Sequence, residues 1–204
     1  MCHVRARVLT FTVEDSPRHR LGLALLLSIG LAASAAATTV TYNLTFGPEA
    51  TGATGSGSGA VVYDDGAHTL AINVSWSGTS GPSTVAHIHC CVATPGSGTV
   101  GIAVSPSTLP GFPNGVTSGS YTTLLDLRLT TTYQPAFLTL SGGTASGAEA
   151  ALKAGMDSGR AYFNIHTSTF PGGEIRAFLT VPEPALAGLL GVAGLARVGR
   201  RRRA

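Results

Sequence analysis

The sequence has little charge and very little lysine. Only 11% of its 204 residues are Asp, Glu, Lys or Arg, and lysine occurs once, at Lys153. Exposed helices need many charged and strongly helix-forming side chains, so this composition excludes a helix bundle. Hydrophobic residues nevertheless make up 44% of the chain, which excludes intrinsic disorder.

Basic side chains are scarce in the middle of the chain. Nine of the 13 Lys and Arg residues lie within residues 1–37 and 182–204, which explains the overall net charge of +3. Residues 38–181 contain four basic and seven acidic side chains, a net charge of −3. A nucleic-acid partner is therefore not expected, because binding phosphates requires a basic surface.

The N-terminal part, residues 1–37, has the features of a secretory signal peptide. An apolar run over residues 21–37, LGLALLLSIGLAASAAA, follows Arg18 and Arg20 and ends in small residues. This order predicts cleavage by signal peptidase after Ala35 or Ala37. A permanent N-terminal membrane helix is the alternative, which the small residues at the end of the run make less favourable.

The C-terminal part, residues 182–204, has three features in a fixed order. Pro182-Glu183-Pro184 is followed by twelve apolar residues, 185–196, and then by an Arg-rich tail. A helix of twelve residues spans only ~18 Å, less than the ~30 Å core of a bilayer, so we expect a hydrophobic helix that anchors the chain transiently in the membrane. An ordinary tail anchor is the alternative.

This order of features resembles the PEP-CTERM sorting signal of bacterial envelope proteins. The resemblance implies that an exosortase-type protease recognises the segment and cleaves near Pro182, Glu183 and Pro184. It also implies a protein exported to the cell surface, the outer envelope or the extracellular matrix.

Residues 38–181 form the expected folded domain. Gly is abundant, with 27 residues in the whole chain, and short stretches alternate between apolar and polar residues. Leu70, Ile72, Val74 and Trp76, for example, share one face of a predicted strand. Strands are predicted over residues 39–46, 59–63, 68–76, 85–90, 99–104, 121–129, 136–140, 160–165 and 174–181. One short helix is predicted over residues 146–154, opened by a capping box of Ser146 and Glu149.

Two separated motifs in this domain are similar to those of the CHRD domain. The first is Ala86-His87-Ile88-His89, and the second runs from Ala161 to Thr167 and continues from Phe170 to Arg176. With the strand pattern, the resemblance predicts an all-β fold, an immunoglobulin-like antiparallel β-sandwich of about eight strands. It implies an extracellular domain without assigned catalysis. The residues of the second motif to which we assign a structural role are Asn164, Thr167, Pro171, Gly173, Glu174 and Arg176.

Three histidines are candidate metal ligands. His87 and His89 are two residues apart on a strand and share a face, and His166 ends another strand. Three converging imidazoles would suit copper or zinc. A hydrogen-bonded structural cluster is the favoured alternative. Metal-bound rings need groups that orient them, and Glu174 is the nearest candidate for such a carboxylate in the motif.

Cys90 and Cys91 are adjacent and stand where the CHRD pattern usually has Gly-Pro. Disulfides persist in exported proteins, so three arrangements are open: a disulfide between the two neighbours, a bridge to another chain, or two thiols beside the histidines.

The combined expectation is a non-catalytic interaction module in the cell envelope or extracellular matrix. The sequence contains no G-x-S-x-G, Walker A or H-E-x-x-H motif, so we expect no enzyme and no cofactor. Loops within Ala50–Gly59, Ser77–Ser83 and Ser105–Gly119 are predicted to bind a surface polysaccharide or protein. The alternative is a metal-binding envelope protein, or a metalloenzyme, that uses copper or zinc on His87, His89 and His166.

Overall fold

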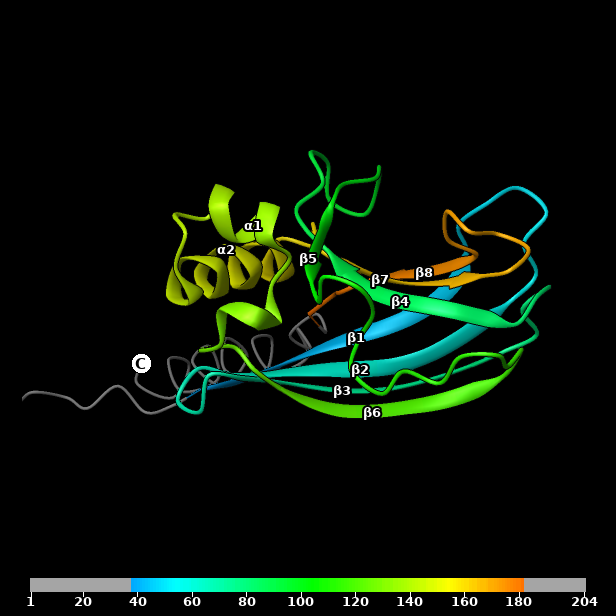
Figure 1. The fold of residues 1–204 in the computed structure, drawn as a ribbon, viewed down its shortest axis with the longest axis horizontal. Coiled ribbons are helices and arrows are strands. Elements are labelled where there is room, and N and C mark those ends of the chain that lie inside the picture. Colours follow the sequence, from blue (N-terminus) through cyan, green and yellow to red (C-terminus); the bar gives the residue numbers. More distant parts are fainter. Residues whose placement is uncertain (1–37, 182–204) are drawn as a thin grey trace, which may run out of the picture. The chain divides into compact units, whose positions relative to one another are not determined.

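The computed structural model describes residues 38–181, which form eight strands and two α-helices (Figure 1). The strands are β1 (Thr39–Pro48), β2 (Ser56–Asp64), β3 (Thr69–Ser77), β4 (Ser83–His89), β5 (Ile102–Val104), β6 (Gly119–Asp126), β7 (Tyr162–Thr167) and β8 (Ile175–Phe178). The helices are α1 (Pro135–Leu140) and α2 (Ala145–Asp157), preceded by a 3₁₀ turn at Thr130–Thr132.

All strand pairs are antiparallel and belong to one curled sheet with the order β5-β4-β7-β8-β1-β2-β3-β6. Strand β1 pairs with β2 along most of its length, and its last residues, Gly47 and Pro48, pair with β8. The predicted all-β, antiparallel fold is confirmed. The curled sheet is sandwich-like, with β1 pairing in both of its halves, whereas the two sheets of an immunoglobulin-like sandwich are separate.

The predicted signal peptide and the predicted C-terminal hydrophobic helix lie outside the described residues. Within residues 38–181, no helix has the length and hydrophobicity needed to cross a membrane.

Alternation along the strands builds the core. Tyr42, Leu44 and Phe46 of β1 are buried, and the residues between them are exposed. Leu70, Ile72, Val74 and Trp76 of β3 alternate in the same way, as their spacing predicts. Strands β1 and β3 therefore each contribute one apolar face to a common core and one polar face to solvent.

Strands β4 and β7 depart from this alternation, because both of their faces are buried. Ala86 and Ile88 pair with Ile165 and Phe163 on the core face. The opposite face carries polar side chains, and loops rather than other strands cover it. This covered polar face contains the candidate site.

Two predictions about helices are wrong. Residues 136–140, a predicted strand, belong to α1, which has Pro135 in its first turn. A short apolar run does not distinguish strand from helix, and a proline in the first turn favours the helix.

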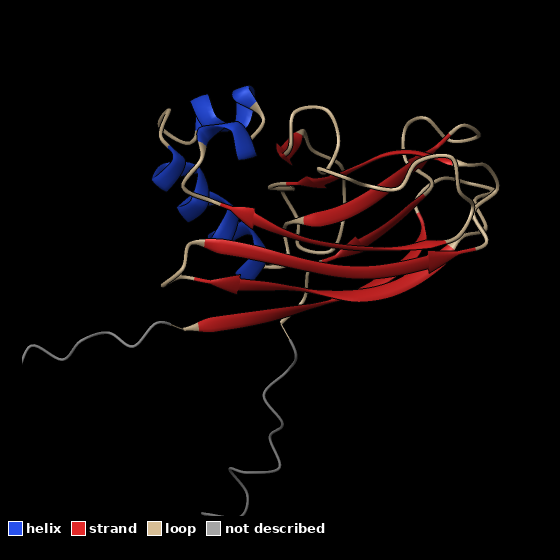
Figure 2. Cartoon of the chain, turned by 60° about the horizontal axis from the view of Figure 1, so that its bottom comes forward, coloured by secondary structure: helices blue, strands red, loops and turns tan. Residues whose placement is uncertain are grey.

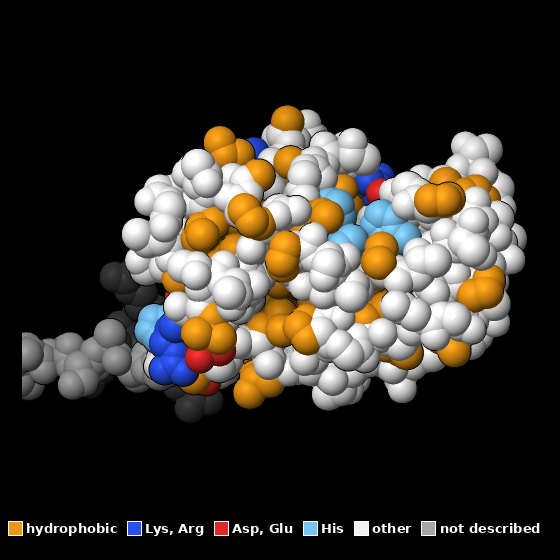
Figure 3. Space-filling model, viewed as in Figure 1, with side chains coloured by type: hydrophobic (Ala, Val, Ile, Leu, Met, Phe, Trp, Pro, Cys, Tyr) orange, Lys and Arg blue, Asp and Glu red, His pale blue; other side chains and the backbone are white. Residues whose placement is uncertain are grey.

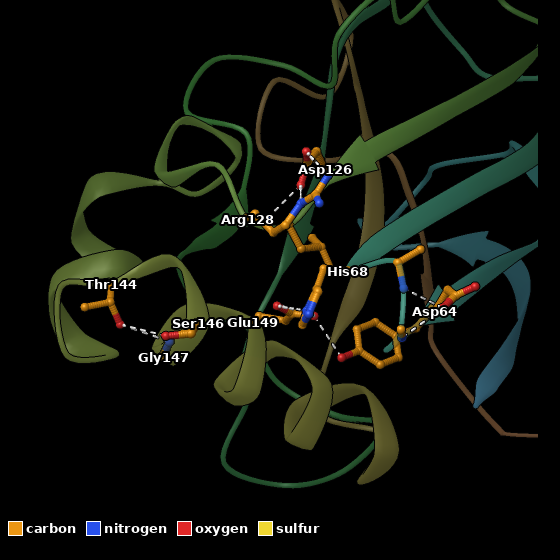
Figure 4. A network of polar contacts seen from close by, with 12 residues as sticks. Asp64, His68, Asp126, Arg128, Thr144, Ser146, Gly147 and Glu149 are labelled. Atoms are coloured by element: carbon orange, nitrogen blue, oxygen red, sulfur yellow. Dashed lines mark hydrogen bonds and ion pairs between the residues drawn. The ribbon is translucent and has the colours of Figure 1, made fainter. Parts of the chain in front are cut away.

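Helix α2 begins earlier than predicted and has no capping box. The hydroxyl of Thr144 caps it by accepting a hydrogen bond from the amide of Gly147 at 3.1 Å. Glu149 is buried instead: its carboxylate accepts a hydrogen bond from the Tyr63 hydroxyl at 2.9 Å and faces His68 Nδ1 at 3.0 Å (Figure 4). These contacts attach α2 to the turn between β2 and β3. Both helices lie near one end of the sheet (Figure 2).

Cys90 and Cys91 form a disulfide between neighbouring residues, one of the three arrangements left open by the sequence. The two sulfur atoms pack against Gly155 of α2, where a β-carbon would overlap both of them. Gly155 is therefore required for the helix to approach the disulfide.

Replacing Gly155 with alanine should lower the free energy of unfolding by about 1–3 kcal/mol, the usual cost of overpacking a core. The helical preference of alanine offsets part of that cost. Denaturant unfolding of the variant measures the loss. Gly47→Ala is the matched control, because no atom lies within 4 Å of a β-carbon there. Equal stability of the two variants would contradict the packing of α2 on the disulfide.

Candidate functional site

Three histidines meet on the covered polar face of β4 and β7. His87 and His89 come from β4, and His166 comes from β7, next to Val85 in the register of the two strands. One nitrogen from each ring lies within 4.8 Å of the other two. His87 and His89 are 5% and 8% exposed, and His166 is half-buried. Histidine side chains reach the surface together on the face drawn in Figure 3.

Each imidazole is held by a backbone carbonyl of a covering loop. His87 Nε2 donates to Ser107 O at 2.8 Å, His89 Nδ1 donates to Val100 O at 2.7 Å, and His166 Nδ1 donates to Pro171 O at 2.7 Å. A carbonyl oxygen only accepts hydrogen bonds, so each of these ring nitrogens carries the proton. In a neutral ring the second nitrogen then carries a lone pair.

The second nitrogen of each ring has no backbone or hydroxyl group as a hydrogen-bond partner. His87 Nδ1 and His166 Nε2 face each other at 3.4 Å, and His89 Nε2 is buried with no hydrogen-bond partner. Burial lowers the pKa of His87 and of His89, although the carbonyl groups that they face favour the protonated form. Both rings are therefore neutral at neutral pH, with lone pairs in the interior of the cluster.

Aromatic and charged side chains surround the cluster. The ring of Tyr162 stacks on His89 with the ring centroids 4.7 Å apart. Arg176 lies over the Tyr162 ring and donates a hydrogen bond to the carbonyl of Gly98 at 2.8 Å. It also pairs with Glu49, with Nη1 3.6 Å from Oε1.

Glu49 connects this group to Asn164, whose side-chain amide donates to Oε2 at 3.2 Å. Burial raises the pKa of Glu49, although Asn164 and Arg176 act in the opposite direction. Gly173, at φ 122°, lies so close that a β-carbon there would overlap the Glu49 carboxylate. The side-chain oxygen of Asn164, Oδ1, is buried without a hydrogen-bond partner, as His89 Nε2 is.

Glu174 does not orient the histidines. It is fully buried, and its carboxylate accepts hydrogen bonds from the amide and hydroxyl of Ser80 at 2.5 and 2.8 Å, and from Thr167 at 2.5 Å. Carbonyl groups orient the rings instead. Burial alone would raise the pKa of Glu174, but the hydrogen bonds from Ser80 and Thr167 outweigh it and leave the pKa below its usual value.

Through its hydrogen bonds with Ser80, Glu174 helps to hold three loops together at one end of the sheet. The loop containing Ser80 is bonded to the loop after β1 by the Thr54 hydroxyl, which donates to Gly78 O at 2.9 Å. It is bonded to the loop after β5 by the amide of Thr79, which donates to Thr117 O at 3.2 Å. We call this set the loop end; it comprises residues 49–55, 78–82 and 105–118. The first predicted loop is shorter than expected, since residues 56–59 begin β2.

Sequence reasoning missed the groups that hold the site together. The carbonyl groups of Val100, Ser107 and Pro171 have no signal in a sequence, because every residue has a carbonyl. Glu49 and Arg176 are far apart in the chain and become neighbours only because β1 pairs with β8. Of the structural residues, Thr167 and Glu174 bond each other, and Asn164 and Arg176 both contact Glu49.

Replacing Glu174 with glutamine should destabilise the domain by about 1–3 kcal/mol at pH 7, because a buried set of charge-assisted hydrogen bonds is lost. The pKa of Glu174 in the folded protein lies below its usual value of 4.5, so its carboxylate stabilises the fold fully above that pH. The benefit disappears as the pH falls through the folded pKa. The difference between wild type and variant should therefore shrink on acidification below about pH 4, as measured by denaturant unfolding.

Asp64→Asn is the control for this experiment. It also removes one negative charge, but at an exposed turn where an amide oxygen can still accept the hydrogen bonds from Gly66 and Ala67. A pH-independent effect of Glu174→Gln, or an equal effect of Asp64→Asn, would contradict the role given to Glu174.

Comparison with known proteins identifies the family. The CHRD domain family model matches residues 33–179, which is most of the chain. Neither a search of curated proteins nor a search of solved structures found a match. The two histidine-containing motifs lie within the matched range, on β4 and β7, as does the Glu174 network. The chain belongs to the CHRD domain family, which indicates an extracellular or secreted interaction module.

Proposed function

We propose that this protein is a non-catalytic CHRD module of the bacterial cell envelope or extracellular matrix, which binds an uncharged surface partner through its loop end. In this proposal, a signal peptide directs export, and an exosortase-type protease processes the sequence around Pro182, Glu183 and Pro184. The family match supports an interaction module, and the sequences of the two terminal segments support export and sorting.

The observation that carries the binding proposal is the chemistry of the loop end. None of residues 49–55, 78–82 and 105–118 is charged except Glu49, which is directed into the Arg176 pair. The loops consist largely of Gly, Ser, Thr and Pro, and hydrogen bonds hold them beside one another. A surface of hydroxyl and backbone groups without charge suits a neutral polysaccharide, whose hydroxyl groups both donate and accept.

The loop end is also firmly anchored, which reduces the ordering cost of binding. Phe112 of the third loop is buried, and its ring stacks on Trp76 with centroids 5.0 Å apart. Leu109 is fully buried, and its amide donates to Ala86 O at 2.9 Å. Glu174 fixes the middle loop through Ser80.

Expression of the whole chain in a Gram-negative host with an exosortase tests export and sorting. Intact mass should show a product lacking residues 1–35 or 1–37 and cut near Pro182–Pro184. Glu183→Ala should retain the C-terminal tail in most molecules, whereas Val181→Ala, next to the motif, should be processed normally. A tail retained in wild type would indicate an ordinary anchor, and an uncleaved leader on soluble cytosolic protein would overturn the export proposal.

Retention on extracted extracellular matrix tests the binding surface. Because the loop end lacks exposed charge, binding should change little when salt rises from about 0.1 to about 1 M, a range over which charge screening becomes strong. Thr51→Glu or Asn114→Glu should weaken retention at least about tenfold, since an unpaired charge would be buried in the interface.

Ala150→Glu is the matched control: Ala150 is exposed on α2, away from the loop end, and should leave retention unchanged. Absence of retention in wild type, or equal losses for the loop variants and Ala150→Glu, would contradict the proposed surface.

A further inference from the structure

We propose that His87, His89 and His166 form a binding site for one divalent transition-metal ion, Zn²⁺ or Cu²⁺. The three candidate ligands lie on β4 and β7 rather than in the loop end, and the inference does not depend on export or on the matrix partner. It concerns metal binding and assigns no reaction.

The main evidence for this site is the tautomer of each ring, which its hydrogen bond to a carbonyl group fixes. Because each ring donates its N–H to a loop carbonyl, each presents its second nitrogen as a lone pair. Metal-ligating histidines characteristically donate the other ring N–H to a carbonyl or carboxylate, which fixes the ring and raises its basicity. All three rings of the cluster have this arrangement.

The separation of the free nitrogens fits a metal ion. Two imidazole ligands at 2.0–2.1 Å from a tetrahedral Zn²⁺ are separated by roughly 3.3–3.4 Å. His87 Nδ1 and His166 Nε2 are 3.4 Å apart, and a nitrogen of the third ring lies within 4.8 Å. A small rotation of His89 would complete a three-nitrogen site.

The donor set selects the class of ion. The group of potential ligands among residues 38–181 contains imidazoles only, without carboxylate or thiolate. Imidazole suits Zn²⁺ and Cu²⁺, whereas Ca²⁺ and Mg²⁺ require oxygen ligands. The cysteine sulfur atoms do not contribute, because they are bonded to each other and pack against α2.

A hydrogen bond, rather than a metal ion, is the competing explanation for the 3.4 Å contact between His87 Nδ1 and His166 Nε2. If His166 were doubly protonated, it would donate both to Pro171 O and to His87 Nδ1. That arrangement would still leave His89 Nε2 buried without a partner. A metal ion satisfies all three nitrogens at once, and so accounts for the cluster as a whole.

The test uses the full chain, purified, treated with a chelator and then titrated separately with Zn²⁺ and Cu²⁺ in a calorimeter. Wild type should bind one equivalent of ion. His166→Gln should weaken binding at least about tenfold, the smallest loss found even when a group behind a ligand is removed. His166 is the least buried of the three, so this variant best preserves the fold, which circular dichroism checks.

His68→Gln is the matched control, because His68 lies in the turn between β2 and β3, faces Glu149 and takes no part in the cluster. Its affinity should equal that of wild type. A second readout needs no variant: the electron paramagnetic resonance spectrum of the Cu²⁺-bound chain should show coupling to three nitrogens. No stoichiometric binding by wild type, equal losses for His166→Gln and His68→Gln, or a spectrum without three-nitrogen coupling would overturn the proposal.

Discussion

Strands β4 and β7 are buried on both faces, and this constraint organises the rest of the domain. Their inner face is apolar and joins the core, but their outer face carries His87, His89, Asn164 and His166. Polar groups removed from water need hydrogen-bond partners, at a cost of about 1–3 kcal/mol for each group left unsatisfied. Among residues 38–181 no further strand covers this face, so backbone carbonyl groups of irregular loops supply the partners of the histidines, and the Glu49 carboxylate supplies that of Asn164. The loops are consequently tied to the strands at defined points.

The same constraint explains what could be predicted from sequence. Alternation in β3 gave its buried face correctly, because one face meets water and the other meets the core. The His-x-His spacing likewise placed His87 and His89 on a common face. These are local relations, fixed by the two-residue period of a strand.

Relations that depend on long-range pairing could not be predicted. Glu149 fitted a capping motif, but the register of the hairpin brings Tyr63 and His68 onto its carboxylate, and burial there outweighs a role at the helix end. Glu174 was the nearest carboxylate to the histidines in sequence. In the folded domain, however, the carboxylate of Glu174 accepts hydrogen bonds from Ser80 and Thr167. Tertiary contacts in both cases decided between partners that sequence spacing alone could not distinguish.

The histidine cluster and the loop end use the same backbone segments, although their chemistry differs. The loop after β5 supplies the carbonyl of Ser107 to His87 and the carbonyl of Thr117 to Thr79. The loop after β7 supplies the carbonyl of Pro171 to His166, while the amide of Ser168 donates to Pro82 O at 2.9 Å. An ion held by the three rings would fix their orientation and so the carbonyl groups bonded to them. The position of the uncharged surface would then depend on two sets of contacts. One is the set of hydrogen bonds to the buried carboxylate of Glu174, and the other is the set between the loop carbonyl groups and the imidazoles.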